Sequence, residues 1–456
     1  MKLKIIFAIF ACKLTRFVLR VFRRGGTALP GQVAVRICPD LLRHLSKGVV
    51  CVVITGTNGK TTSARMLEQF FIDARKSYFT NKSGSNLLRG ITGEFVYNAT
   101  AAGKPRRKYA VIECDEAASK KVFEYINPRV VLVTNVFSDQ LDRYGTIAAV
   151  LENIQTGVKN APNAVVCLNA DDSLTSSIAD EIPNRVVYYG GDAGRLDHRA
   201  DELSDASRCI RCGATYEYDY TTYAHLGGFR CPSCGYARKK TDVVVTGVKA
   251  RDADSQTVIM RVFDKTSDIT INLPGDYNIY NAAGATAAAT GFGFSIEEAK
   301  DALLRFECGF GRMEKLELNG LPVRIILVKN AAGCNQALSY LTSLTGDALI
   351  AICLNDRIAD GTDVSWIKDA RFERLTGMGG RIRGILVSGT RAGDMAERLK
   401  DAGLPDAQIR LCRDPGEVLE TALAQDAPVY ILPTYTAMLE LRDKICRDFG
   451  LKHYWE

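Results

Sequence analysis

The chain has 456 residues, more than one hydrophobic core usually supports, so we expect two or three domains. Hydrophobic residues make up 46% and charged residues 24% of it, a balance that excludes a disordered protein and a polytopic membrane protein. The net charge is +7, but residues 1–39 hold eight Lys and Arg and neither Asp nor Glu, so the remainder is nearly neutral and does not indicate nucleic-acid binding.

The N-terminal segment, residues 1–48, is predicted to contain a basic amphipathic helix. Basic residues recur at helical spacing, and apolar residues occupy the other side: Lys13, Arg16, Arg20 and Arg23 or Arg24 against Leu14, Phe17, Val18, Val21 and Phe22. One interpretation is attachment to an anionic membrane surface or to a partner. The other is a helix that covers the core of the next domain and leaves its charged face solvated. The apolar run Ile5–Cys12 is too short to span a bilayer, and no small-residue cleavage site follows it before Arg23 and Arg24, so we expect neither a transmembrane helix nor a signal peptide.

A glycine-rich loop follows the first buried strand. Val49–Ile54 predicts the strand and Ser63–Ala74 a helix, and between them lie Gly56, Thr57, Asn58, Gly59, Lys60, Thr61 and Thr62. Such a loop directs backbone N–H groups and a helix N-terminus at phosphate oxygens. Lys60 is predicted to contact the β- and γ-phosphates and the Thr61 hydroxyl to bind Mg²⁺. The first Gly of the general P-loop pattern would fall at Ile54, so this is a short variant, and we predict that it binds a nucleotide.

Later strands place carboxylates where an open parallel sheet binds ligands. Buried strands are predicted, with room for crossover helices between them, at Tyr109–Glu113, Val130–Thr134, Ala164–Leu168 and Val186–Tyr189. This pattern favours a mainly parallel, doubly wound sheet. Two runs are followed by acidic clusters: Glu113 with Asp115 and Glu116, and Asp139 with Asp142. Each cluster either supplies a second metal ligand or caps helices.

Two close cysteine pairs lie in a Tyr-, Gly- and Cys-rich stretch, residues 207–238, that interrupts the α/β pattern. Cys209 and Cys212 precede Cys231 and Cys234 by an 18-residue spacer, and a Gly follows each pair. The spacing predicts an inserted, structural Cys₄ zinc ribbon, with a redox pair or two disulfides as the alternatives. Basic and aromatic residues surround the pairs, so a nucleic-acid-dependent ATPase is an alternative function.

The C-terminal part of the chain returns to an α/β pattern. Short strands at Val258–Phe263 and Ile269–Leu273 lead into an Ala-rich helix over residues 281–290. From about residue 320 strands alternate with helices, at Val323–Val328, Ala348–Cys353, Ile385–Val387 and Val429–Leu432. We predict an α/β protein with a central ATP-binding domain over residues 49–318 and a smaller Rossmann-like domain over residues 319–456.

Several of these motifs resemble those of the Mur ligases. Thr55–Thr62 is similar to their ATP loop, Thr134–Gly145 to their Thr-Asn-x-x-x-Asp-His-x-Asp-x-x-Gly motif, and Asn278 and Asn281 to an Asn-x-x-Asn segment. Arg312 is similar to an arginine at the end of their central domain.

Three departures narrow the resemblance. The ATP loop begins so early that we expect the domain that binds a UDP-linked precursor to be absent, Gln140 stands where the motif has His, and the Cys₄ stretch is inserted. Together with Lys329–Gly333 and Leu354–Ile367, these features resemble the MurT family, the ligase subunits of lipid II isoglutaminyl synthases. A central Mur-ligase domain and a C-terminal MurT-type domain are what this resemblance implies for the fold.

The resemblance implies ATP-dependent amidation of the D-glutamate α-carboxylate of the lipid II stem peptide to D-isoglutamine, through an acyl phosphate attacked by ammonia. It implies that Lys60, Thr61 and Glu113 hold ATP and Mg²⁺, and that Asn278, Asn281 and Arg312 hold the nucleotide. A self-sufficient Mur-type amino-acid ligase is the other alternative function.

The chain contains no convincing ammonia source of its own, since Cys334 lacks the glycine two residues on that a nucleophile turn needs. The resemblance implies a GatD-like glutamine amidotransferase bound to the C-terminal domain as a heterodimer. Asp363 would complete its catalytic triad, with Asp356 and Asp360 as alternatives. Because lipid II is membrane-linked, the expected location is the cytoplasmic face of the cell membrane.

Overall fold

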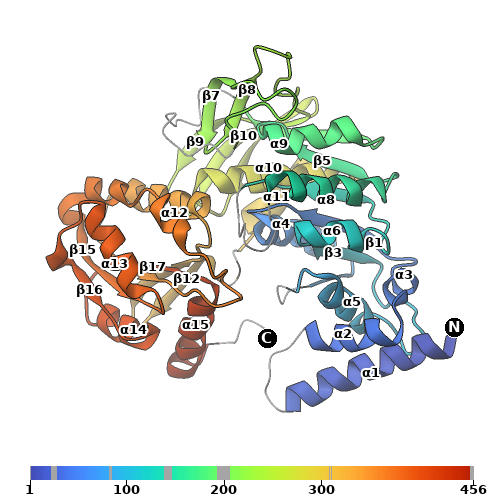
Figure 1. The fold of residues 1–456 in the computed structure, drawn as a ribbon, viewed down its shortest axis with the longest axis horizontal. Helices are drawn as coiled ribbons and strands as arrows, with labels where there is room; N and C mark the ends of the chain where they lie inside the picture. The colour runs from blue at the N-terminus through green and yellow to red at the C-terminus, as the bar shows by residue number, and fades with distance from the viewer. Residues whose placement is uncertain are drawn as a thin grey trace.

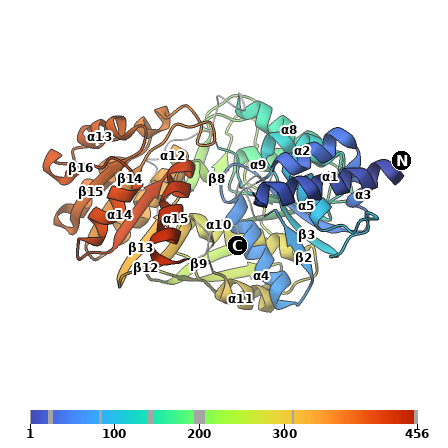
Figure 2. The ribbon, with the colours of Figure 1, turned by 90° about the horizontal axis from the view of Figure 1, so that it is seen from below.

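The structure is a computed structural model that describes residues 2–21, 28–81, 85–137, 146–192, 206–307, 309 and 311–451. Two α/β lobes lie side by side, and the N-terminal helices lie at the end of the first lobe (Figures 1 and 2). This arrangement confirms the predicted α/β class.

A nine-stranded sheet forms the first lobe, in the order β11-β10-β9-β6-β5-β4-β1-β3-β2. The seven strands from β9 to β2 in that order are parallel, and β9, β10 and β11 pair antiparallel. The strands are β1 (Val50–Thr55), β2 (Tyr78–Thr80), β3 (Tyr109–Glu113), β4 (Val130–Val133), β5 (Val165–Asn169), β6 (Val186–Gly191), β9 (Val243–Arg251), β10 (Gln256–Val262) and β11 (Lys265–Ile271). The predicted mainly parallel sheet is confirmed, although β2 was not predicted.

Helices cover both faces of this sheet because successive side chains of a buried strand point to opposite sides. Val52 and Ile54 of β1 belong to one core, and Cys51 and Val53 belong to the other. The first core packs against α4 (Lys60–Asp73), α10 (Asp276–Thr290) and α11 (Ile296–Arg305). The second packs against α1 (Lys2–Val21), α2 (Ala28–Ile37), α3 (Leu41–Leu45), α5 (Leu88–Tyr97), α6 (Glu116–Val122), α8 (Ile147–Lys159) and α9 (Ser173–Ser177) with the 3₁₀ turn η1 (Ile178–Glu181).

Helix α1 differs from the prediction in length and in orientation. It begins at Lys2, eleven residues before the predicted Lys13, and it packs on α2 and α5 through Ala8, Ile9 and Cys12. The apolar side chains that were predicted to form one face of the helix, Leu14, Phe17, Val18 and Val21, are exposed. The alternative in which this apolar face covers the core is therefore wrong. Among the described residues, no helix combines the length and apolar character that crossing a bilayer requires.

The second lobe contains a six-stranded sheet in the order β12-β13-β17-β14-β15-β16, parallel except for β12 against β13. Its strands are β12 (Arg312–Leu318), β13 (Leu321–Ile326), β14 (Ala348–Cys353), β15 (Ile382–Ser388), β16 (Ile409–Leu411) and β17 (Val429–Pro433). One face packs against α12 (Ala331–Ser343), α13 (Ala392–Asp401) and the 3₁₀ segments η2 (Ser365–Lys368) and η3 (Phe372–Arg381). The other face packs against α14 (Pro415–Leu423) and α15 (Tyr435–Phe449), and η4 (Asp406–Gln408) precedes β16.

A small hairpin of β7 (Glu217–Tyr223) and β8 (Leu226–Arg230) is inserted between β6 and β9. It lies at the edge of the first lobe above the sheet in Figure 1. The cysteine-rich stretch belongs to this insertion, as predicted.

Candidate active site

The glycine-rich loop joins β1 to α4 and is held in a shape that only glycine permits at two positions. Gly56 has φ 117° and Gly59 has φ 81°, both in the left-handed region. A Cβ added to Gly59 would lie 2.1 Å from Oδ1 of Asn281, and one added to Gly56 would lie 2.4 Å from Oγ1 of Thr134. The strand, loop and helix predicted from the sequence are therefore present, with α10 packed directly on the loop.

Lys60, the first residue of α4, is buried and paired with a buried carboxylate. Its Nζ lies 3.0 Å from Oε2 of Glu116 and donates to the carbonyl oxygens of Gly56 and Thr57. Burial by itself would lower the pKa of Lys60, but Glu116, Glu113 and Asp115 outweigh burial and raise it. Burial would likewise raise the pKa of Glu116, but Lys60 and Lys329 lower it. Both groups are therefore charged at neutral pH, and the ammonium faces the loop.

Thr61 and Glu113 lie together at the carboxyl end of the sheet. Thr61 Oγ1 donates to Glu113 Oε2 at 2.5 Å, and Asn81 holds the backbone of Glu113 through hydrogen bonds of 2.7 and 2.9 Å. A hydroxyl and a carboxylate oxygen beside a phosphate loop are hard ligands of the kind that Mg²⁺ prefers, so these residues fit the predicted metal.

The neighbouring acids have other partners. Asp115 caps α6 by accepting from the N–H groups of Ala117 and Ala118, which is the capping alternative considered from the sequence. Glu116 pairs with Lys60. The remaining candidates, Asp139 and Asp142, lie with Gln140 outside the described residues.

Three residues that were not predicted as site residues contact Thr57 and Asn58 of the loop. Asn135 accepts from the N–H groups of Asn58 and Thr57 with its side-chain and backbone oxygens, both at 2.9 Å. From the second lobe, Lys329 Nζ lies 3.4 Å from the Thr57 carbonyl oxygen, and Asn330 Nδ2 donates to Asn58 Oδ1 at 3.1 Å. The site therefore lies between the two lobes.

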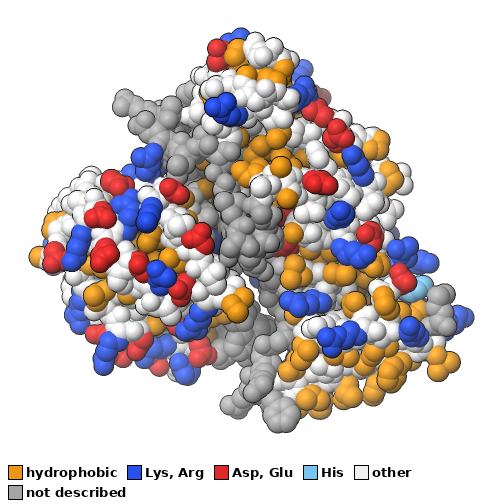
Figure 3. All heavy atoms as spheres, in the orientation of Figure 1, with side chains coloured by type: hydrophobic (Ala, Val, Ile, Leu, Met, Phe, Trp, Pro, Cys, Tyr) orange, Lys and Arg blue, Asp and Glu red, His pale blue; other side chains and the backbone are white. Residues whose placement is uncertain are grey.

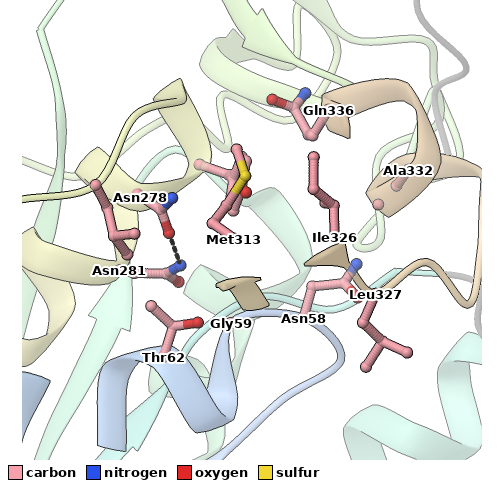
Figure 4. A pocket seen from close by; sticks show the side chains of 13 residues that line it. Asn58, Gly59, Thr62, Asn278, Asn281, Met313, Ile326, Leu327, Ala332 and Gln336 are labelled. Atoms are coloured by element: carbon pink, nitrogen blue, oxygen red, sulfur yellow. Dashed lines mark hydrogen bonds between the residues drawn. The ribbon is translucent and has the colours of Figure 1, made fainter. Parts of the chain in front are cut away.

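A pocket opens beside the loop (Figure 4). Asn278 and Asn281 of α10 face it from one side and are joined by a hydrogen bond of 3.0 Å, while Met313, Ile326 and Gln336 face it from the second lobe. The lining is largely apolar with a few amides, which suits a nucleobase and ribose. Arg312 begins β12 nearby, but its side chain lies outside the described part of the chain.

The three aspartates considered for the partner's triad follow β14 and differ in their surroundings. Asp360 is buried, and its two oxygens accept from the N–H and hydroxyl of Thr436 and from the Arg357 N–H. Asp356 contacts Thr390 and Arg391. Asp363 is exposed, and its Oδ1 accepts from the Ser365 N–H at 2.8 Å, which lowers its pKa. Of the three, Asp363 is the most exposed, Asp356 is half-buried and Asp360 is buried.

The four cysteines predicted to bind zinc converge at one point. Their sulfur atoms all lie within 4.8 Å of one another, with 3.6 Å between Cys209 and Cys234 and 3.5 Å between Cys212 and Cys231. A tetrahedron with Zn–S bonds of about 2.3 Å has S···S edges of roughly 3.7 Å, whereas a disulfide needs about 2.05 Å. Gly213 and Gly235 follow the pairs with φ 76° and 74°, so both turns have the same shape. The donor set fits a structural Zn²⁺.

The basic and aromatic residues around the ribbon are engaged within the chain. Arg211 pairs with Asp180, Arg230 with Glu217 and Arg238 with Asp171. Tyr216, Phe229 and Tyr236 form the small core of the ribbon together with two of the cysteines. These side chains are therefore not arranged as a stacking surface for nucleic acid.

The inserted hairpin is connected to the ATP loop through Phe137. His225, in the turn of the hairpin, is fully buried, and its Nε2 lies 3.1 Å from Oδ1 of Asp172. The same carboxylate accepts from the Val136 N–H, and the ring of His225 lies 4.7 Å from that of Phe137. Phe137 in turn exchanges hydrogen bonds with Thr57 of the loop. The hairpin thus supports the ATP loop through Phe137.

The Mur ligase middle-domain model matches residues 54–224, and the MurT ligase C-terminal model matches residues 327–438. The chain is 34% identical over 446 residues to the MurT subunit of glutamine-hydrolysing lipid II isoglutaminyl synthase from Streptococcus pneumoniae, covering 97% of both chains. The chain belongs to the MurT family. The corresponding subunit from Staphylococcus aureus is 32% identical, covering 97% of this chain and 98% of that one.

Solved structures of Mur-type ligases share this fold. A pseudomurein peptide ligase from Methanothermus fervidus has a TM-score of 0.65 at 20% identity, with 90% of this chain and 81% of that chain covered. MurF from Thermotoga maritima in complex with ADP has a TM-score of 0.62 at 14% identity, with 91% and 84% covered. The MurT-family chain therefore has the fold of Mur-type ligases, as its motifs predicted.

Proposed function

We propose that this MurT-family chain is the ATP-dependent ligase subunit that amidates the D-glutamate α-carboxylate of lipid II. The observation that carries the proposal is the cluster of the buried Lys60 with the half-buried Thr61 and Glu113, in a chain matched almost end to end by MurT subunits. We propose a division into the N-terminal segment 1–48, an ATP-binding domain 49–318 and a partner-binding domain 319–456.

The reaction proceeds in two displacements. A carboxylate oxygen of the substrate attacks the γ-phosphorus of ATP, and ADP leaves, giving an acyl phosphate. The nitrogen of ammonia then attacks the acyl carbon, and phosphate leaves with the former carboxylate oxygen while the nitrogen loses a proton. Mg²⁺, when bound, neutralises charge on the phosphate oxygens.

The residues of the chain bind and orient the reactants. Lys60 turns from Glu116 to the phosphates, where the N-terminus of α4 also presents N–H groups. Thr61 and Glu113 hold Mg²⁺, and Asn278, Asn281 and Arg312 hold the nucleoside beside the cavity. Lys329 of the second lobe lies at the loop, so it adds a positive charge near the phosphates.

The nitrogen source is a GatD-like glutamine amidotransferase that forms a heterodimer with the second lobe. The exposure of Asp363, and the internal hydrogen bonds of Asp360, support Asp363 as the residue that orients the partner's histidine. Ile358, on the same loop, is 85% exposed and offers an apolar anchor for the partner. The ribbon cysteines hold a structural Zn²⁺, and the enzyme acts at the cytoplasmic face of the cell membrane, where lipid II is exposed.

The test is to measure ADP release from the purified chain with ATP, Mg²⁺ and lipid II. The added component is ammonium, a single amino acid, or single-stranded DNA or RNA. The proposal predicts that ammonium stimulates ADP release and that the others do not. Stimulation by an amino acid would indicate a self-sufficient Mur-type ligase. Stimulation by nucleic acid without lipid II would indicate the ribbon-based ATPase.

A further inference from the structure

Helix α1 carries an apolar face that nothing in the described chain covers. Six apolar residues follow one another at alternating spacings of four and three and therefore share one side of the helix. We call them the outer stripe: Leu3, Phe7, Phe10, Leu14, Phe17 and Val21. Each is between 49% and 86% exposed. Figure 3 shows hydrophobic side chains gathered along the lower right edge of the molecule, where Figure 1 places α1.

The contacts of the opposite side fix this orientation. Ala8, Ile9 and Cys12 are buried, Lys13 Nζ donates to the Ala99 carbonyl oxygen at 2.7 Å, and the Arg16 guanidinium lies 3.7 Å from the centre of the Tyr97 ring. Two cations of α1 thus attach the helix to α5 and to the segment that follows it, while Phe7, Phe10 and Phe17 are exposed. Monomeric soluble proteins seldom expose a contiguous apolar surface of this kind without an interaction partner.

The exposed charges of α1 and of the turn that follows α5 are positive, and the one acid of α5 near Arg16 and Arg20, Glu94, is half-buried. Helix α1 contains no Asp or Glu, and Lys2, Lys4 and Arg20 are exposed along it. The turn after α5 adds four exposed cations, Lys104, Arg106, Arg107 and Lys108. This cationic turn lies beside α1, because a Cβ on its Gly103 would contact Ile5 and Ile9 at 3.6 and 3.7 Å. A second copy of the chain would bring like charges together, whereas an anionic lipid surface would complement them.

We propose that α1 lies in the plane of an anionic membrane surface, with the outer stripe inserted among the acyl chains and the cationic turn on the phosphate groups. This extends the proposed function, in which the substrate is lipid-linked, but lipid binding is measured without any amidation. A helix of 20 residues is about 30 Å long, and lying flat it presents the whole stripe at one depth.

The test is co-sedimentation of the full chain, with its glutaminase partner co-expressed, with phosphatidylcholine vesicles that contain or lack phosphatidylglycerol. The variant is Phe7→Ser, Phe10→Ser and Phe17→Ser together, and the matched control replaces three exposed apolar residues elsewhere, Ile72→Ser, Leu304→Ser and Leu411→Ser. We expect the parent and the control to bind phosphatidylglycerol vesicles equally and the α1 variant to lose more than about tenfold in partition coefficient. High salt should weaken binding of the parent.

Absence of parent binding, or equal binding of the α1 variant, would overturn the proposal. So would a parent that self-associates without lipid while the α1 variant is monomeric, because the stripe would then be a contact between copies. A water-soluble stem-peptide fragment separates the two proposals: parent and α1 variant should amidate it equally. If neither does so while the parent binds vesicles, the proposed function fails and the membrane surface stands.

Discussion

Replacing Glu116 by Gln tests the buried ion pair that holds Lys60. The Lys60 and Glu116 side chains are only 9% and 4% exposed, and removing one partner of a buried pair costs about 3–5 kcal/mol because the other charge stays uncompensated. Lys60 keeps the Thr57 carbonyl oxygen at 3.1 Å, so we take the lower end, about 3 kcal/mol. With an unfolding entropy of about 2 cal/mol/K per residue, a lobe of about 300 residues loses roughly 1.6 °C per kcal/mol, so the melting temperature should fall by about 5 °C.

The assay is differential scanning calorimetry with and without a non-hydrolysable ATP analogue and Mg²⁺. The analogue should shift the melting temperature of Glu116→Gln more than that of the parent, because phosphate oxygens replace the lost negative charge beside Lys60. Glu124→Gln, which breaks an exposed pair with Lys121 just after the same helix, is the matched control and should change stability by less than about 1 kcal/mol.

The pH dependence follows from the lowered pKa of Glu116, which the positive charges of Lys60 and Lys329 hold below its ordinary value of 4.5 against the effect of burial. The pair contributes its full stability above pH 4.5 and loses it as the pH falls through the folded-state pKa. The difference between parent and Glu116→Gln should therefore be constant near neutral pH and shrink below pH 4.5. A variant that melts within about 1 °C of the parent at pH 7 would refute the reasoning.

Three further predictions concern the other parts of the site. Gly59→Ala should abolish nucleotide binding in calorimetric titration, because Gly59 has a left-handed φ and the added methyl group would collide with Asn281. The control Gly346→Ala, where the methyl group has open space, should bind nucleotide normally. Normal binding by Gly59→Ala would contradict the loop geometry. Metal analysis should find one Zn²⁺ per chain. Cys231→Ser should lose the metal and bind nucleotide more weakly, because the hairpin supports Phe137 and Thr57. A metal-free variant with the parent's nucleotide affinity would show that the ribbon does not support the loop. Asp363→Asn should lose glutamine-dependent amidation and keep ammonium-dependent amidation. Asp360→Asn, which removes a buried hydrogen-bond acceptor, should lower the melting temperature. Loss of both activities in a stable Asp363→Asn protein would exclude a role confined to the partner's triad.

The parts of the site that are local in sequence were predictable. The loop from Gly56 to Thr62 could be located because a buried strand, two glycines in left-handed conformations and a helix follow one another within a short stretch. The ribbon was predictable for the same reason, since each pair of cysteines and its glycine form one turn. In both cases neighbouring residues determine the backbone shape.

The parts that depend on contacts between distant segments were not predictable. Glu116 lies 56 residues from Lys60 and was one of several acids after the same strand, so only the folded sheet shows which of them meets the lysine. Lys329 comes from the other lobe, 272 residues after Thr57, and although its segment carries part of the family resemblance, its sequence does not show that it meets the ATP loop. Periodicity predicted the two faces of α1 but not which face would be buried, because that depends on Tyr97 and Ala99 of another element.

The most direct measurement of the central claim is mass spectrometry of lipid II after incubation with this chain, its glutaminase partner, ATP, Mg²⁺ and glutamine. Replacement of the carboxylate OH by NH₂ on the D-glutamate should lower the mass by about one unit, and Lys60→Ala should abolish the change while the partner remains bound. Unchanged lipid II with both glutamine and ammonium, from a chain that still hydrolyses ATP, would contradict the account.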